Sequence, residues 1–582
     1  MYLSIQKRDG REYLSIQKGY WNKETKSRTS TTVKVLGFVD VLKDEYDDPI
    51  AHFKQVAKEM TENEKAQRHI SINIDMSEQL PDNAQGTYNF GYAVPMKVYH
   101  SLWLGDFMKR KMVGQRFEFN TNSIMIMLVI SQILSPGSKK RAFEEKGRFF
   151  ERFDFSLDDV YRALSHFAKI GTELQQSMYG RVRAKYGSDT SIVYYDVTNY
   201  YFQISKPDEN RKYGRSKENR KKPIIQMGLA MDADGVPIHY KLFPGNTLDK
   251  QTFRSVIGDV RLKYDTGRIV VVADMGIITG DNIYYLTGGR KQKPLNGYIF
   301  SFSVRGGAEK FQEYVLDESG YMDAKGKPVT DDNNIDFKVK SRLEARDISV
   351  TMSNGKKKTK QVYEKQVVFW NRKYSNKARA ERAEVLAKAE SLIKSPNKFT
   401  KATTYGAAAY VLNIAYDKKT GEIREKDGKA LLLDESKISE EERFDGYYAI
   451  VTSELHMTDS EIIDAYRGLW EIEETFRITK SDLAARPVHL QDYDHIDAHF
   501  LICFISLVII RIIQKETGKK YSTAVIIEEL NKIVCMHEFE NIYLFGHNSE
   551  ITANLSEVFG IDFSKKRLRL DEIKKILGDV KK

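Results

Sequence analysis

One aspartate interrupts a segment that is otherwise suited to the interior of a β-sheet. The segment from Ser191 to Thr198 is rich in β-branched and aromatic residues, as buried strands are, and Asp196 lies near its end. A buried, ionised carboxylate is costly unless it is paired or binds a metal ion. An Asp that caps a turn at a strand end is the alternative, and Asp196 alone leaves both interpretations open.

The same arrangement occurs a second time along the chain. The aliphatic run 269–272 leads to Asp274, and Gly276 follows so that the chain can turn. The pattern therefore predicts two strands that each end in an aspartate.

A third carboxylate lies on a predicted helix from Tyr466 to Lys480. Tyr466, Glu473 and Lys480 are seven residues apart, which is nearly two helical turns, so the three side chains should share one face. Glu474 is a rival for the carboxylate position, but the spacing favours Glu473. Hard oxygen ligands of this kind suit Mg²⁺ or Mn²⁺, and a pair of such ions can act on a phosphodiester.

These stretches resemble the DDE transposases of bacterial insertion sequences, in the insertion-sequence-four superfamily and its insertion-sequence-1634-like branch. That superfamily has an Arg three residues after the helix Tyr, where this chain has Leu469, so Arg467 and Arg477 are the nearby candidates for its phosphate contact. The resemblance rests on four motifs: Asp196-Val197-Thr198, Asp274-Met275-Gly276, Gly245-Asn246-Thr247 with Gln251-Thr252-Phe253, and the helix with Tyr466, Glu473 and Lys480.

The resemblance implies an enzyme that cuts at the terminal inverted repeats of its element and joins the freed 3′ ends to target DNA. Its partners would be double-stranded DNA and a second copy of the chain when the ends are paired. The implied ligands of two Mg²⁺ ions, which Mn²⁺ could replace, are Asp196, Asp274 and Glu473, and the implied DNA contacts are Tyr466, Lys480, Arg467 and Arg477. One alternative is an RNase H-like nuclease without strand transfer. The other is a catalytically silent DNA-binding derivative, and the presence of all three carboxylates argues against this second alternative.

Composition agrees with a polyanionic partner in a reducing compartment. The formal charge is +11 and the pI is near 9.0. Cys503 and Cys535 are the only cysteines, which excludes a disulfide scaffold. Residues 1–18 do not resemble a signal peptide, and the apolar stretches 124–130 and 500–510 are shorter than the roughly 20 residues that span a bilayer. We therefore expect a cytoplasmic, bacterial protein that associates with the nucleoid when on DNA.

The predicted elements give an α/β fold, in which an RNase H-like catalytic core is interrupted by a β-rich insertion and preceded by a β-hairpin arm and a helical domain. An insertion is required because Asp274 and Glu473 are 473 − 274 = 199 residues apart. The expected regions are a β-hairpin arm (1–45), a mainly helical DNA-binding region (46–185), the core in two parts (186–304 and 444–515), the β-rich insertion with one charged helix (305–443), and C-terminal helices with a possible dimerisation role (516–582).

Several local expectations can be tested against a structure. Asp9-Gly10 should form the turn of a hairpin that either grips DNA or is a structural arm. The basic turn 135–141 and the basic loop 206–222 should contact DNA, or else be solvated. Further expectations are that Trp370 is a core residue rather than a base-stacking one, that Trp470, Ile472, Phe476 and Leu483 pack against the sheet, and that His489, His495 and His499 pack rather than bind metal.

Overall fold

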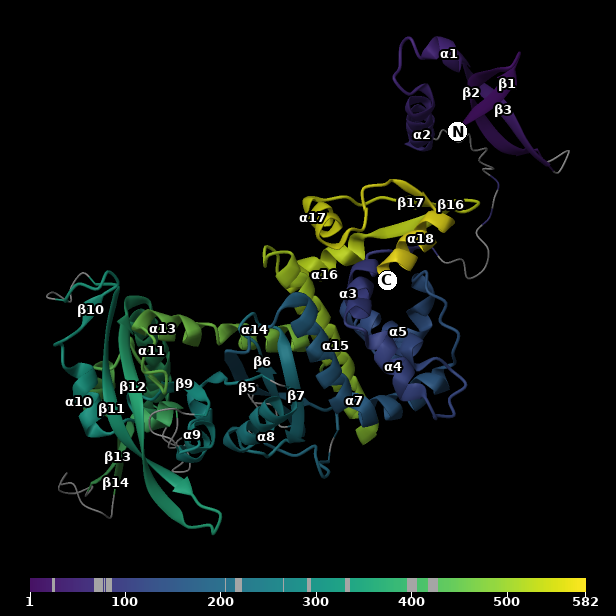
Figure 1. Cartoon of the computed structure of the whole chain (residues 1–582). Coiled ribbons are helices and arrows are strands. Elements are labelled where there is room, and N and C mark those ends of the chain that lie inside the picture. The colour runs from purple at the N-terminus through teal and green to yellow at the C-terminus, as the bar shows by residue number, and fades with distance from the viewer. Residues whose placement is uncertain are drawn as a thin grey trace. The chain divides into compact units, whose positions relative to one another are not determined.

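The computed structural model of the chain describes residues 1–22, 27–66, 77, 79, 86–204, 206–214, 222–264, 266–289, 295–329, 335–394, 406–416 and 428–582. It divides into two compact units, residues 1–84 and 85–582, and Figure 1 shows the elements of each. Residues 215–221 of the predicted basic loop 206–222 and parts of the insertion lie outside the described residues.

The first unit is a three-stranded antiparallel sheet with helices on one face. Its strands are β1 (Tyr2–Arg8), β2 (Arg11–Asn22) and β3 (Ser27–Phe38), and the predicted hairpin turn is present, with Asp9 and Gly10 at positive φ. The helices are α1 (Val39–Leu42) and α2 (Pro49–Ala66). Phe53 of α2 packs against Leu14 of β2. The helix that we assigned to the helical region therefore belongs to this unit, because the sheet has an apolar face that it must cover.

The second unit contains a nine-stranded sheet in the order β10-β11-β12-β15-β9-β8-β5-β6-β7. Its middle has the predicted order of three antiparallel strands, a helix, a parallel strand, a helix and a fifth strand, with β8 parallel to both β5 and β9. These elements are β5 (Ile192–Tyr201), β6 (Ile224–Met231), β7 (Pro237–Pro244), α8 (Asp249–Lys263), β8 (Val270–Ala273), α9 (Gly280–Thr287) and β9 (Gly297–Phe302).

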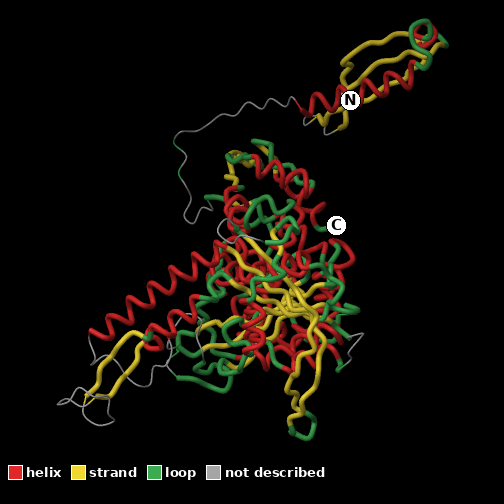
Figure 2. The backbone as a smooth tube through the Cα atoms, turned by 90° about the vertical axis from the view of Figure 1, so that its left-hand side faces the viewer, coloured by secondary structure: helices red, strands yellow, loops and turns green. Residues whose placement is uncertain are grey.

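Part of the inserted segment extends this sheet: its strands β10, β11 and β12 continue it beyond β15. Strand β15 (Tyr447–Thr452) pairs with β9 on one side and with β12 on the other, so the insertion's strands satisfy the backbone groups at the edge of the core. Figure 2 shows β11 and β12 as a long hairpin. The insertion holds β10 (Met322–Asp323), β11 (Phe337–Thr351), β12 (Lys357–Asn371), the separate pair β13 (Val411–Tyr416) and β14 (Gly428–Leu433), and the helices α10 (Glu309–Leu316), α11 (Arg372–Lys394) and α12 (Glu435–Glu442).

A helical layer packs around α15 (Tyr493–Glu516). This helix is long and apolar enough to cross a membrane by length and composition, but 94% of its apolar window is buried, against α7, α5 and α3 among others. One long helix of this layer, α7 (Leu157–Tyr186), closes the region 46–185 that we predicted to be mainly helical. The other helices of the layer are α3 (Ala93–Ser101), α4 (Leu104–Met112), α5 (Thr121–Leu134) and α6 (Lys139–Glu144).

Two further expectations are corrected by packing. In the basic turn 135–141, Ser138 caps α6 and Lys139 is buried beside His499, so Lys139 neither contacts DNA nor is solvated. The C-terminal region contributes three strands to a four-stranded sheet, β18-β17-β16-β4, and is therefore not made of helices alone. Its elements are β4 (Tyr88–Asn89), α16 (Thr523–Lys532), β16 (Val534–Phe539), β17 (Ile542–Phe545), α17 (Glu550–Phe559), β18 (Arg567–Arg569) and α18 (Leu570–Val580).

Candidate active site

The two predicted aspartates lie on neighbouring parallel strands at the same level. Ile192 pairs with Val270 and Tyr194 with Val272, so the same register carried two residues further places Asp196 beside Asp274. Strand β8 ends at Ala273, whereas β5 continues past Asp196 to Tyr201 because β6 still pairs with it. Our expectation that the first strand ends at Asp196 was therefore wrong, although the aspartate lies where the parallel pairing stops.

Both aspartates face the helices α13 (Asp459–Arg467) and α14 (Trp470–Arg477) rather than α8 and α9. Side chains alternate along a strand, and Tyr194 and Val272 belong to the core that contains residues of α13 and α14. Tyr195 and Ala273 belong to the opposite core, with α8 and α9. By the same alternation Asp196, two residues beyond Tyr194, points toward α14.

Asp274 is held by three donors to the same oxygen. Its Oδ1 accepts hydrogen bonds from the Met275 backbone N–H (2.7 Å), the Ser301 hydroxyl of β9 (2.7 Å) and the Tyr466 hydroxyl of α13 (3.4 Å). Burial raises the pKa of Tyr466, so its hydroxyl stays protonated and able to donate. The other oxygen, Oδ2, is the one that could accept a further ligand.

The predicted helix from 466 to 480 is broken into segments. Helix α13 begins with a capping box of Thr458 and Glu461. Helix α14 follows, and Ile478–Asp482 form one π-helical turn. At the break, Leu469 and Glu471 donate to the carbonyls three residues before them. A Cβ on Gly468 would lie 1.9 Å from the Tyr194 hydroxyl, so a glycine is needed for α14 to approach β5.

Three glutamates on α14 have different surroundings. Glu471 is buried and pairs with Arg511 of α15 and with Lys519, whose Nζ lies 2.7 Å away. Glu474 accepts from Arg511 Nη1 at 3.0 Å. Glu473 is exposed, and no hydrogen bond or ion pair joins it to another residue within the described part of the chain. Glu473 is thus the glutamate of this group whose carboxylate is left for a ligand.

The predicted DNA-contacting residues Arg467, Arg477 and Lys480 differ in how far they are exposed. Arg467 and Arg477 are exposed and pair with nearby acids of the same segment, Asp464 (3.2 Å) and Asp482 (3.1 Å). Lys480 is half-buried in the π-helical turn, with its Nζ 5.9 Å from the centre of the Tyr200 ring of β5.

Packing around α14 follows the prediction except at one residue. Ile472, Phe476 and Leu483 are buried, but Trp470 is 55% exposed because it lies on the outer side of the helix. Trp370 is half-buried rather than a core residue, and its indole N–H donates to the Asp445 carbonyl at 2.9 Å. His499 is buried, and burial lowers its pKa to about 3.

The structure brings two of the three carboxylates together. Among the described residues, no group of three acidic, histidine or cysteine side chains is close enough to hold a metal ion. The donors at the paired aspartates are all oxygens, which fits Mg²⁺ or Mn²⁺ better than a softer metal. Tyr466 links this pair to the helical segment that carries Glu473.

Sequence reasoning missed three residues that position the site: Ser301, Tyr194 and Arg511. Arg511 could have been found from the sequence, because a single cation within the apolar run 500–513 requires an acidic partner. Its Nε also donates to the Gly235 carbonyl at 2.9 Å, so it joins α15, α14 and the turn between β6 and β7. Ser301 and Tyr194 had no such signal.

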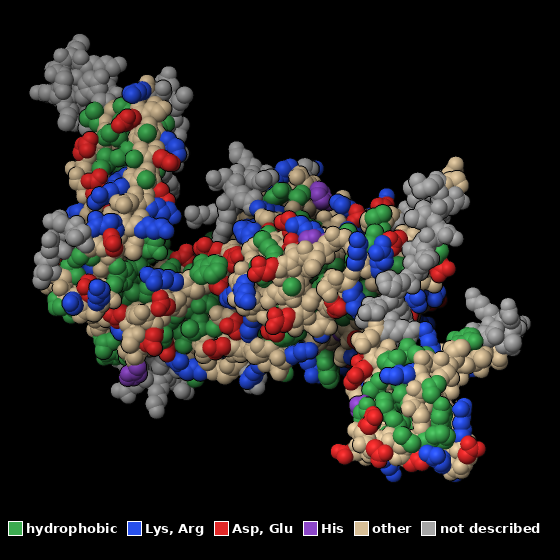
Figure 3. All heavy atoms as spheres, turned by 90° about the horizontal axis from the view of Figure 1, so that it is seen from above, with side chains coloured by type: hydrophobic (Ala, Val, Ile, Leu, Met, Phe, Trp, Pro, Cys, Tyr) green, Lys and Arg blue, Asp and Glu red, His purple; other side chains and the backbone are tan. Residues whose placement is uncertain are grey.

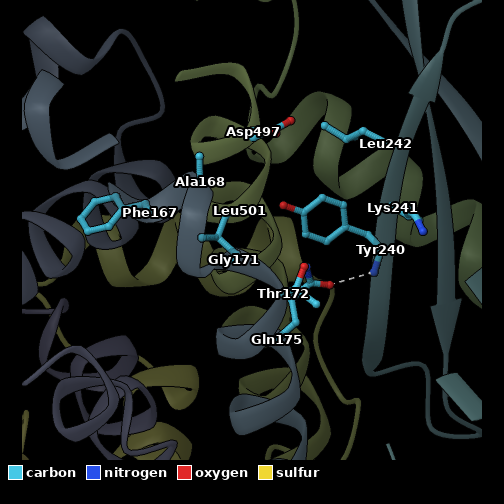
Figure 4. Close-up of a pocket in the computed structure, with 10 residues that line it drawn as sticks. All are labelled: Phe167, Ala168, Gly171, Thr172, Gln175, Tyr240, Lys241, Leu242, Asp497 and Leu501. Carbon is cyan, nitrogen blue, oxygen red and sulfur yellow. Dashed lines mark hydrogen bonds between the residues drawn. The ribbon is translucent and has the colours of Figure 1, made fainter. Parts of the chain in front are cut away.

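A separate cavity of about 220 Å³ lies between α7, α15 and β7 and contains none of the predicted site residues. Figure 4 shows Gln175 accepting from the Tyr240 backbone N–H, and Asp497 at the rim. Burial and the nearby Asp494 raise the pKa of Asp497 to about 6.

Fold and site together define a mixed α/β protein with a carboxylate site at the end of two parallel strands. Residues 187–509, more than half of the chain, match the family model of the transposase DDE domain, and the chain belongs to this family. A solved structure titled "Mos1 transposase paired-end complex with left transposon end" is similar at 12% identity and a TM-score of 0.11. The similar region covers 38% of this chain and 60% of that one. No curated protein was found to be similar in sequence.

Proposed function

We propose that this transposase cuts DNA at the terminal inverted repeats of an insertion sequence and joins the 3′ ends to target DNA. The observation that carries the proposal is the placement of Asp196 and Asp274 side by side, facing the helices that carry Tyr466 and Glu473. The family match spans all four residues. The motif flanks favour the insertion-sequence-1634-like branch.

The strand order supports an RNase H-like core. Numbered along the chain from β5, the strands of the middle of the sheet lie in the order 3-2-1-4-5, with the first three antiparallel and the fourth parallel to the first. In this arrangement strands one and four are neighbours, so their ends present the two aspartates together.

Asp196, Asp274 and Glu473 would hold two Mg²⁺ ions, for which Mn²⁺ could substitute. When bound, such ions supply activation of the attacking oxygen and stabilisation of the leaving oxygen. Tyr466 and Ser301 hold one oxygen of Asp274, which leaves the other for this purpose. Because Glu473 is exposed and no hydrogen bond or ion pair joins it to a described residue, its carboxylate is left for a metal ion.

The reaction would proceed in two displacements at phosphorus. In the first, a water oxygen bonds to the phosphorus at the end of the element, the bond to the 3′ oxygen breaks, and that oxygen takes up a proton. In the second, the freed 3′ hydroxyl attacks a target phosphodiester, gives up its proton, and releases a 3′ hydroxyl of the target. Lys480, Arg467 and Arg477 would hold backbone phosphates in line.

Double-stranded DNA is the proposed partner, both as transposon end and as target, and its polyanionic backbone suits the net charge of +11. Joining two ends in one event requires two active sites, so we propose a homodimer when the ends are paired. The cytoplasm, with its access to the nucleoid, is the proposed location.

The test is a cleavage and strand-transfer assay with purified protein, Mg²⁺, labelled duplexes that carry the element's ends, and a supercoiled target. We expect end cleavage and joined product, both lost in Asp196→Asn and Asp274→Asn. Asp154→Asn, at an exposed surface aspartate, is the control. Cleavage without joining would establish the nuclease instead. End binding without cleavage, with or without metal, would establish a silent derivative.

A further inference from the structure

The three-stranded sheet of the first unit has one face that no element of that unit covers. Leu3 and Ile5 of β1 pair with Ile16 and Leu14 of β2, and this side packs against α1 and α2. By alternation, the neighbouring residues Tyr2, Gln6 and Arg8 point to the other side. Exposure agrees, since Tyr2 is 48% and Val35 is 60% exposed.

The strand residues of the uncovered face include cations and polar side chains but no described acid, and the acid beside the face is Asp40 of α1, which pairs with Arg11. Its charged residues are three arginines, Arg8 on β1, Arg11 on β2 and Arg28 on β3, placed there by the pairing register. Amides and hydroxyls lie between them, among them Gln6, Gln17 and Thr32. Arginine, glutamine and threonine are the side chains that hydrogen-bond to base edges and phosphates.

Charge is segregated within this unit. The segment 39–48, which leads into α2, has five acidic residues and one lysine. The uncovered face has a positive potential and the segment that leads into the covering helix a negative one. A polyanion would therefore meet the sheet and not the helical side.

A row of stacked side chains fixes two of the arginines. The guanidinium of Arg8 lies 4.3 Å from the centre of the Tyr13 ring, that of Arg11 lies 4.3 Å from the Phe38 ring, and the two rings contact edge to face at 5.1 Å. Arg11 also pairs with Asp40 at 2.6 Å. Planar guanidinium groups held in this way lose little freedom on binding, and Arg8 presents its donors without a carboxylate partner among the described residues.

We propose that this face binds duplex DNA in the major groove and contributes sequence recognition at the element's ends. Three strands spaced by about 4.8 Å make a sheet about 10 Å across, which fits a groove about 12 Å wide. The Tyr13 and Phe38 rings contact one another and the arginines, so these two rings are not displayed for stacking on unpaired bases. The inference deepens the proposed function, on which it rests for the identity of the DNA.

The test compares two double variants of the full chain that lose the same charge from the same strands. Arg8→Gln with Arg28→Gln removes cations from the uncovered face. Lys7→Gln with Lys34→Gln removes exposed cations that the register places on the opposite face. Each protein is used to select duplexes from a random-sequence library, and affinity for the selected duplex is measured by anisotropy at several salt concentrations.

We expect the wild type and the lysine variant to select the same motif. We expect the arginine variant to bind the selected duplex about five- to a hundredfold more weakly and to lose preference at some positions of the motif. Equal losses in both variants, or a preference of the wild type for a single-stranded competitor, would overturn the proposal. Asp274→Asn is measured in parallel, and we expect it to lose cleavage but to select the same motif as the wild type. The cleavage proposal and the recognition proposal can therefore fail separately, because cleavage tests the first and selection tests the second.

Discussion

The hydroxyl of Tyr466 donates to Oδ1 of Asp274 across the boundary between helix α13 and the end of strand β8. This contact, together with the close approach of Gly468 to Tyr194, fixes the helical segment over the paired aspartates. The geometry of the site thus depends on contacts between residues that lie 192 (Asp274 and Tyr466) and 468 − 194 = 274 (Tyr194 and Gly468) positions apart in sequence.

Tyr466→Phe should lower the rate of DNA cleavage by about tenfold, equivalent to about 1.4 kcal/mol, because Asp274 loses one donor that orients it. The fold should be retained, since the ring still packs. Ser301→Ala, which removes the 2.7 Å hydrogen bond to the same oxygen, should lower the rate at least as much. Single-turnover cleavage measures both, and a rate unchanged in Tyr466→Phe would show that the hydroxyl does not position Asp274.

Glu473→Gln should abolish cleavage while changing the free energy of unfolding by less than about 0.5 kcal/mol, since the side chain is exposed. Glu474→Gln should leave cleavage in place but lower the free energy of unfolding by about 1–3 kcal/mol, because it weakens the pairing with buried Arg511. Denaturation and cleavage assays on the matched pair decide between the two glutamates. An active Glu473→Gln protein would remove this residue from the proposed site.

Gly468→Ala should destabilise the second unit by about 1–3 kcal/mol and impair cleavage, because the new methyl group meets the Tyr194 ring and moves α14 away from β5. Gly180→Ala is the matched control in helix α7, where a Cβ meets nothing within 4 Å, and it should be neutral or slightly stabilising. Thermal unfolding of both variants tests the expectation. Equal Tm values would mean that the helix accommodates a side chain at the break.

Asp232 should make the protein less stable as the pH rises. Burial raises its pKa to about 6, from 3.8, against the opposing effect of its hydrogen bonds with Ser188 and Val236. Between these two pKa values the carboxyl is protonated in the folded protein but not in the unfolded chain. The stability that it contributes is therefore full below about 3.8 and is lost as the pH rises through about 6.

Asp232→Asn should remove this dependence and raise the free energy of unfolding near neutral pH by about 1–3 kcal/mol. The amide can keep the backbone hydrogen bonds. Comparing the variant with the wild type at about pH 4.5 and about pH 7.5 measures the difference, which should be larger at the higher pH. A difference that does not change with pH would contradict the raised pKa.

Local patterns in the sequence were sufficient for several elements. The strand that carries Asp196, the strand that leads to Asp274 and the Asp9-Gly10 turn form as predicted, because periodicity and turn residues act over a few residues. The same patterns could not show that β12 would pair with β15, or that residues 534–545 would form strands, since those choices depend on which edge is available elsewhere.

The sequence by itself determined the candidate carboxylates and the order of strands that carry two of them, because each signal is contained in a short run of residues. Only the tertiary structure decided how they are arranged. The register of β5 on β8 places Asp196 beside Asp274, and the pairing of Glu471 and Glu474 with Arg511 leaves Glu473 exposed. These outcomes depend on long-range packing and on the need of a buried cation for acidic partners, which no local pattern encodes.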